Sequence, residues 1–148
     1  MRRLTRIWPA RIAALCLVLA PAFTRPVDAH HSFSAEYAAE RTATLTGALA
    51  RIDWVNPHVW IYVDVKGSGG SVVRWAVECG APNSMLRRGV SKDVLVVGSE
   101  LVVDGYLAKD GRPAIKGRSV RWAGSRVVYI GSPGTGAPDD PGAPSSPR

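Results

Sequence analysis

The stretch HVWIYVDVK at residues 58–66, followed by GSGG at 67–70 and SVVRWAVEC at 71–79, decides the fold of this chain. In the two outer segments apolar and polar residues alternate one by one, which is typical of strands with one buried face. The glycine-rich segment between them is typical of the turn of a hairpin. The sequence therefore predicts two antiparallel strands, with Trp75 on the buried face of the second strand.

Further strands are predicted on both sides of this hairpin, at residues 42–54, 100–108, 114–122 and 127–130. A short helix is predicted over residues 83–88, because Pro82 suits the first turn of a helix. The order is three strands, a short helix and two or three more strands, with a long first strand. This order predicts an all-β fold: a small five- to six-stranded OB-like Greek-key barrel with one short helix between strands three and four. A β-sandwich or an open meander of the same strands is the alternative.

The first 29 residues have the pattern of a signal peptide. Basic residues precede an apolar run from Ile12 to Ala20, and the small residues of VDA at 27–29 fit the cleavage site of signal peptidase. The apolar run is shorter than the ~20 residues that a transmembrane helix needs, and no later stretch of the sequence is longer. We therefore predict a periplasmic or secreted protein with no transmembrane segment, whose mature chain begins at His30.

The rest of the chain divides into three parts. Residues 30–41 are expected to form an N-terminal arm, which Phe33 and Tyr37 pin to the surface. The β domain is expected at 42–130. Residues 131–148 are rich in Gly, Pro and Ser and hold few apolar side chains, so we expect a disordered tail that has nothing to pack.

Charge and cysteine content restrict the function further. The chain has 19 basic and 12 acidic residues, but the predicted signal peptide contains five of the arginines and one aspartate. The mature chain then keeps a small excess of positive charge, which argues against a nucleic-acid partner. Cys79 is the single cysteine of the mature chain, so it forms no internal disulfide and is expected to be a small buried side chain. Metal ligation or an intermolecular disulfide is the alternative role. We expect a monomer.

The three histidines define the first candidate site. Cleavage after Ala29 would place the α-amine and imidazole of His30 beside His31, while His58 begins the second strand. A set of amine and imidazole nitrogens suits Cu(II), and less selectively Zn(II). The sequence therefore predicts a metal centre at His30, His31 and His58. In the alternative interpretation, the first two belong to a solvated terminus and His58 makes a local hydrogen bond at the strand start.

The second candidate site is an outward-facing surface formed by Trp60, Tyr62 and Arg74. In an OB-like barrel the outer face of strands two and three is the usual ligand platform, and aromatic rings there stack on bases or sugar rings. In the alternative, the arm or a protein partner covers these rings, or one of them belongs to the core.

Motifs for catalysis are absent from the sequence: it has no serine elbow, glycine-rich phosphate loop or close carboxylate pair. We therefore predict a binding module rather than an enzyme, with a ligand or partner that the sequence does not name. The carboxylates on the predicted strands are expected to be solvated charges on an exposed sheet face; they are Asp53, Asp64, Glu78 and Asp104.

Five strings of the sequence resemble a family of small exported bacterial proteins, known chiefly as a domain of unknown function. They are HHSFSAEY at 30–37, TLTG at 44–47, IDWVNPHVWIYVDV at 52–65, RWAVECGAPNSMLRRG at 74–89 and GSELVVDGYLAKDG at 98–111. The double histidine and NPHVW are the distinctive motifs, and the resemblance extends from His30 to Trp122. It implies an exported single-domain β protein of uncharacterised activity. The resemblance implies a small residue such as glycine at position 79, and Cys79 departs from it.

Overall fold

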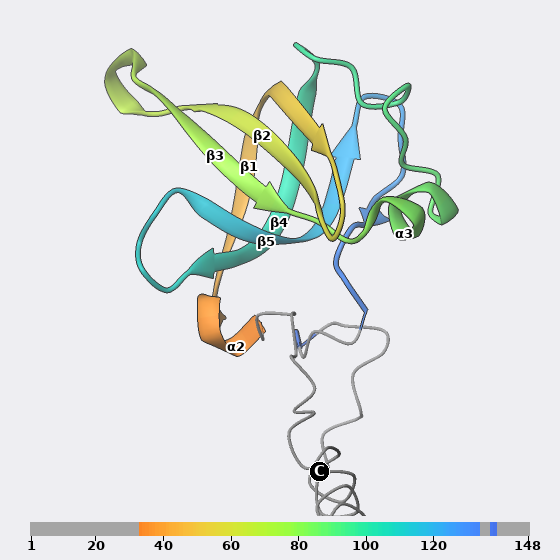
Figure 1. Ribbon diagram of the computed structural model, residues 1–148. Helices are drawn as coiled ribbons and strands as arrows, with labels where there is room; N and C mark the ends of the chain where they lie inside the picture. The colour runs from red at the N-terminus through yellow and green to blue at the C-terminus, as the bar shows by residue number, and fades with distance from the viewer. Residues whose placement is uncertain (1–32, 134–136, 139–148) are drawn as a thin grey trace, which may run out of the picture.

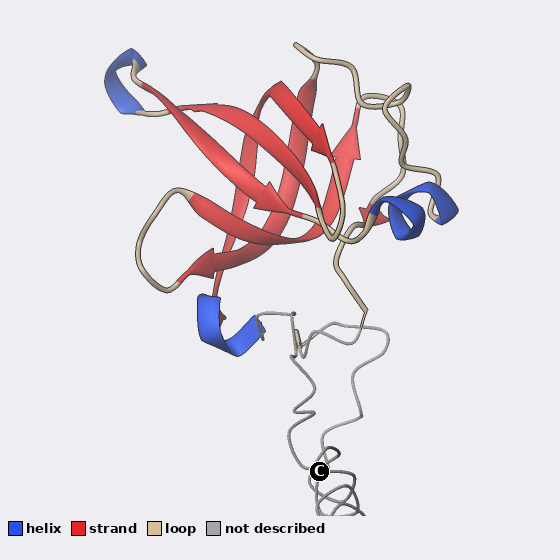
Figure 2. Ribbon diagram, in the orientation of Figure 1, coloured by secondary structure: helices blue, strands red, loops and turns tan. Residues whose placement is uncertain are grey.

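A computed structural model of the chain describes residues 33–133 and 137–138. Its helical segments are short: α2 (Phe33–Glu36), the 3-10 helix η2 (Ser68–Gly70) and α3 (Pro82–Arg87). The rest of its regular structure is strand, which confirms the predicted all-β class (Figure 2). The strands are β1 (Tyr37–Trp54), β2 (Val59–Lys66), β3 (Val72–Glu78), β4 (Glu100–Ala108), β5 (Ala114–Trp122) and β6 (Val128–Tyr129).

The strands pair in the order β3-β2-β1-β4-β5-β6, and these neighbours are antiparallel (Figure 1). The long strand β1 pairs with β4 along its first part and with β2 along its second part. In addition, the end of β3 pairs in parallel with the start of β5 over three residue pairs, from Ala76–Ala114 to Glu78–Lys116. Each strand from β1 to β5 therefore has a partner strand on both of its sides.

The core is built from the inward-facing residues of these strands. The alternation predicted for residues 58–66 is confirmed, because Val59, Ile61 and Val63 have no exposed surface while Trp60 and Tyr62 are half-buried. Burying a side chain of this size contributes about 1.5–3 kcal/mol. The other large, fully buried side chains are Leu49, Val77, Met85, Val90, Leu95, Leu101, Val103, Ile115 and Ile130.

The first half of β3 extends past this core. Along its inward face Val77 is fully buried, Trp75 is half-buried against the core, and Val73 is 42% exposed. The predicted facing of Trp75 is thus confirmed, although the side chain is half-buried rather than fully enclosed. The β2–β3 hairpin projects beyond the other strands (Figure 1), and residues 66–74 at its tip are exposed.

Substituting Trp75 with alanine should therefore cost about 1.5–2.5 kcal/mol of unfolding free energy. This is below the ~3–5 kcal/mol typical of a fully buried tryptophan, because water already reaches part of this ring. Urea unfolding measured by circular dichroism tests the value. A loss above 4 kcal/mol would show that the ring is part of the main core.

The N-terminal part of the domain begins earlier than predicted. β1 starts at Tyr37 rather than at residue 42, and residues 33–36 form helix α2 instead of an extended arm. Phe33 and Tyr37 are both buried, and the Phe33 ring meets the Tyr106 ring edge-on with centroids 5.1 Å apart. A second apolar cluster on the outer face of β4 thus fixes this part of the chain, which is the pinning role expected of the two rings.

The beginning of the predicted disordered tail also packs on the domain. Ser132 and Ala137 are buried, and Ala137 belongs to the cluster around Phe33. The carbonyl oxygen of Gly131 accepts a hydrogen bond from Arg88 Nη1 at 3.0 Å. The prediction that the tail has nothing to pack is therefore wrong for residues 131, 132 and 137, whereas Pro133 and Pro138 are exposed; residues 134–136 and 139–148 lie outside the described part. None of the helices in the described residues is long and apolar enough to cross a membrane.

Candidate functional site

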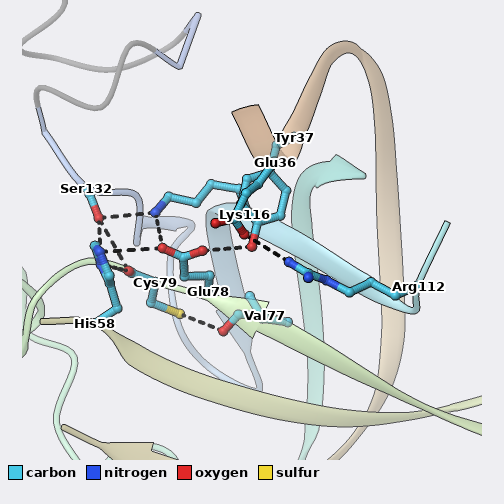
Figure 3. A network of polar contacts seen from close by, with 9 residues as sticks. All are labelled: Glu36, Tyr37, His58, Val77, Glu78, Cys79, Arg112, Lys116 and Ser132. Atoms are coloured by element: carbon cyan, nitrogen blue, oxygen red, sulfur yellow. Dashed lines mark hydrogen bonds and ion pairs between the residues drawn. The ribbon is translucent and has the colours of Figure 1, made fainter. Parts of the chain in front are cut away.

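A network of polar side chains surrounds Glu78 at the end of β3 (Figure 3). Its Oε1 accepts a hydrogen bond from Lys116 Nζ at 2.7 Å, and its Oε2 accepts one from Tyr37 Oη at 2.7 Å. Glu78 and Lys116 are register partners in the parallel β3–β5 pair, which places their side chains on the same face. The Lys116 side chain is 5% exposed and that of Glu78 is 12% exposed. The network is thus a nearly buried ion pair that joins β1, β3 and β5.

The charges of this network follow from its contacts. Burial alone would raise the pKa of Glu78, but the charge and hydrogen bond of Lys116 and the hydrogen bond of Tyr37 outweigh burial and lower the pKa. Burial, reinforced by the Glu78 charge, raises the pKa of Tyr37, so the phenol keeps its proton and donates. Because the folded pKa of Glu78 lies below its ordinary 4.5, its contribution to stability is present above that value. The contribution is lost as the pH falls through the lowered folded pKa.

His58 connects this network to the C-terminal segment. Its Nδ1 lies 3.1 Å from the carbonyl oxygen of Cys79, and because a carbonyl only accepts, Nδ1 donates in this contact. Its Nε2 lies 3.5 Å from Glu78 Oε1. The Ser132 hydroxyl lies 3.3 Å from Nδ1 and donates to the same Cys79 carbonyl at 3.3 Å. His58 thus hydrogen-bonds at the start of the second strand, as in the alternative interpretation, but its partners Cys79 and Ser132 lie 21 and 74 residues away in the sequence rather than nearby.

The grouping of Ser132, His58 and Glu78 is not arranged to activate a nucleophile. A serine nucleophile gives its proton to an unprotonated imidazole nitrogen. Here the nitrogen nearest Ser132 is the donor to the Cys79 carbonyl, and the serine hydroxyl is itself buried and donates to that carbonyl. These contacts brace β2, β3 and the segment after β6 against one another.

Cys79 is fully buried, as predicted for the single cysteine of the domain. Its Sγ donates to the Val77 carbonyl oxygen at 3.7 Å. Burial raises the pKa of this thiol, so it stays protonated at neutral pH. A protonated, buried thiol packs like a small apolar side chain and is a poor nucleophile.

Of the predicted metal ligands, His30 and His31 lie outside the described residues. Their convergence on His58 thus stays a prediction. Within residues 33–133 and 137–138, no three His, Cys, Asp or Glu side chains are grouped so that they could hold a metal ion. Beside His58 the Lys116 ammonium pairs with the nearest carboxylate, and its positive charge opposes a second cation at that place.

The three residues predicted to bind a ligand share one outward surface on β2 and β3. We name it the platform and define it as Trp60, Tyr62 and Arg74, with Arg51 and Asp64 beside them. Arg74 makes a bidentate ion pair with Asp64: its Nε donates to Oδ1 at 2.8 Å and its Nη2 donates to Oδ2 at 2.9 Å. The Arg51 guanidinium lies over the Tyr62 ring, 4.1 Å from its centroid. Both aromatic residues are half-buried, so part of each side chain remains accessible.

Sequence reasoning missed Arg51 and misjudged Glu78. Arg51 faces Tyr62 across the β1–β2 pair only because the register shifts between Leu49 and Arg51. Glu78 was expected to be a solvated charge, and that expectation is wrong. Its partner Lys116 stands 38 residues away, so only a predicted pairing of β3 with β5 would have brought the two together.

Comparisons with known proteins place the chain in a family without supplying an activity. No curated protein and no solved structure matched it. The sequence model of one family, described as a family of unknown function (DUF6152), matches residues 18–117. The match covers more than half of the chain and includes β1 to β4, the start of β5 and all five residues of the platform. The chain therefore belongs to this family of unknown function, DUF6152.

Proposed function

We propose that this chain is an exported binding module whose five long strands form an OB-like barrel. The parallel β3–β5 pair supports the barrel, because it joins the two ends of the strand order β3-β2-β1-β4-β5. The position of α3 between β3 and β4 is the one expected for the helix of an OB-like fold. The signal-peptide pattern of residues 1–29 supports export to the periplasm or the outside of the cell.

The platform is the proposed binding surface. The observation that carries it is the placement of Trp60 and Tyr62 on the same face of β2, half-exposed and two positions apart. Alternate residues of a strand are about 7 Å apart, so the rings can support two parts of one ligand. The Arg51 contact on Tyr62 and the Arg74–Asp64 pair hold the surroundings of the rings in place before a ligand arrives. Such a surface suits a ligand with flat or cyclic units.

The platform predicts a specific effect of losing Trp60. Replacing it with alanine should weaken binding of a ring-bearing ligand at least tenfold, since one stacked base is worth ~1–3 kcal/mol. Tryptophan fluorescence titrations with chitohexaose and a deoxythymidine decamer provide the measurement. Trp60→Phe is the matched control, because it keeps a ring and should keep most of the affinity. Equal affinity of the wild type and Trp60→Ala would remove the platform as the binding surface.

Copper binding by the processed N-terminus is the second candidate function. It is favoured by the position of His30 and His31 directly after the VDA cleavage site. A mature chain beginning at His30 should bind one Cu(II), and more tightly above neutral pH than below pH 6. The reason is that the α-amine and the imidazoles must lose protons to become ligands. Zn(II) is expected to bind less selectively.

Calorimetry on three proteins tests the copper site. One extra residue before His30 removes the amine from the chelate and should weaken Cu(II) binding at least tenfold, which equals about 1.4 kcal/mol. His58→Ala distinguishes two forms of the copper site. If the N-terminus alone binds Cu(II), the affinity is unchanged, whereas a site that also uses His58 binds Cu(II) more weakly. Mass spectrometry must first place the start of the exported chain at His30. The absence of saturable copper binding would end this proposal and leave the platform unaffected.

A further inference from the structure

A groove runs along the outer face of β4 and β5, on strands that the platform does not use. It consists of two adjoining hollows of about 210 and 290 Å³. Val102 and Arg121 line both hollows, so the two hollows are neighbours on the surface. The first hollow reaches Thr44 on β1, and the second reaches the turn after Trp122. We call this surface the β4–β5 groove.

One end of the groove offers only hydrogen-bond acceptors. The Thr44 hydroxyl donates to Asp104 Oδ1 at 2.6 Å, and the Ser119 hydroxyl donates to Asp104 Oδ2 at 2.9 Å. Both hydroxyl protons are therefore committed to the carboxylate. The lone pairs that remain on these three side chains can accept hydrogen bonds from a ligand. The Asp104 side chain is also held in one orientation by its two donors.

Arg121 supplies hydrogen-bond donors in the middle of the groove. It is exposed, and among the residues that the structure describes its guanidinium has no hydrogen-bond or ion-pair partner. Arg121 and Ser119 stand two positions apart on β5, so their backbone positions lie about 7 Å apart along the strand, on the same face. Val102 lies opposite Arg121 on β4, and Val127, which is 61% exposed, adds apolar surface to the first hollow.

These groups decide the charge of a fitting ligand. An anion attracted by Arg121 would be repelled by Asp104 and by Glu100, which lines the second hollow. A cation attracted by these carboxylates would be repelled by Arg121. A neutral ligand with hydroxyl groups at both ends uses all of them, because each hydroxyl donates and accepts. Its carbon–hydrogen faces can pack on the valines and on Trp122.

We propose that the β4–β5 groove binds a neutral sugar ring, with Arg121 donating to hydroxyls at one end of the ring and Asp104 accepting from hydroxyls at the other. The ring can be a free monosaccharide or one unit of a glycan chain. The site is independent of the platform, so either proposal can fail without the other.

NMR titration of amide shifts tests the groove with glucose, N-acetylglucosamine and their trimers as probes. At least one sugar should shift the amides of Asp104, Ser119 and Arg121 saturably, with a dissociation constant in the millimolar range or below. Arg121→Ala and Asp104→Asn should each weaken that binding at least tenfold. The matched control is Arg126→Ala, which removes an exposed cation beside the groove that does not line it.

Further comparisons in the same titrations identify the form of the sugar and test whether the groove is the binding site. A trimer that binds more tightly than its monomer indicates a glycan, whereas equal affinities indicate a free monosaccharide. Trp60→Ala should leave these shifts unchanged, because Trp60 lies on the platform. Three results would overturn the proposal: no saturable shift at the groove with any of these sugars, unchanged affinity in Arg121→Ala, or tighter binding of inorganic phosphate than of the sugars at the groove.

Discussion

Substituting Lys116 with alanine should destabilise the fold by about 3–5 kcal/mol, one of the two largest effects that we expect. The substitution leaves the carboxylate of Glu78 nearly buried without the ammonium that lies 2.7 Å from it. An uncompensated buried charge costs several kcal/mol, even where the complete ion pair contributes little. Denaturant unfolding at pH 7 measures the loss.

Two further variants make this result specific. In the double variant Lys116→Met, Glu78→Gln neither charge remains, so it should be more stable than Lys116→Ala alone. Lys92→Ala removes an exposed lysine and should change stability by no more than about 0.5 kcal/mol. If Lys116→Ala cost less than 1 kcal/mol, the account of the buried pair would be wrong.

Removing residues 131–148 should lower the melting temperature by roughly 10–20 °C. The truncation deletes the Ser132 hydroxyl from the His58 and Cys79 contacts, the Gly131 acceptor of Arg88 and the buried Ala137. Together these contacts are worth about 2–3 kcal/mol, at about 1 kcal/mol for each hydrogen bond. One kcal/mol corresponds to ~4–8 °C in a domain of this size.

A second truncation is the control for the tail. A chain ending at Pro138 keeps all the tail contacts that the structure describes, and it should melt at the wild-type temperature. Calorimetry on the three chains gives the comparison. Equal melting temperatures for all three would restore the interpretation of residues 131–148 as a tail that packs on nothing.

Local patterns were sufficient to predict most of the fold. Strict alternation located β2 and β3, and the turn chemistry located the connection between them, because both signals involve neighbouring residues. How deeply each side chain is buried could not be predicted in this way, because burial depends on residues that are distant in the sequence. Trp75 is on the predicted face, yet its exposure depends on how far the hairpin extends past β5. In the same way, the packing of Ala137 depends on Phe33, which lies a hundred residues earlier.

The residues of the candidate site also differ in whether local sequence patterns could predict their positions. Trp60, Tyr62 and Arg74 share a surface because alternation along two adjacent strands already fixes their faces. The Glu78–Lys116 pair depends on the parallel contact between β3 and β5, which no short sequence window contains. Spacing alone places no side chain of a three-histidine centre relative to another, so that hypothesis depends on solution experiments.

Chemical-shift mapping tests the central claim, that the platform is the binding surface, most directly. The mature protein is titrated with a panel of ring-bearing ligands, including chitohexaose and a deoxythymidine decamer, while the backbone amides and tryptophan indole protons are followed. We predict saturable shifts for at least one ligand, largest at Trp60, Tyr62 and Arg74 and reduced at least tenfold in apparent affinity by Trp60→Ala. Saturable shifts confined to other surfaces, or no saturable shift at these three residues with any ligand of the panel, would contradict the account.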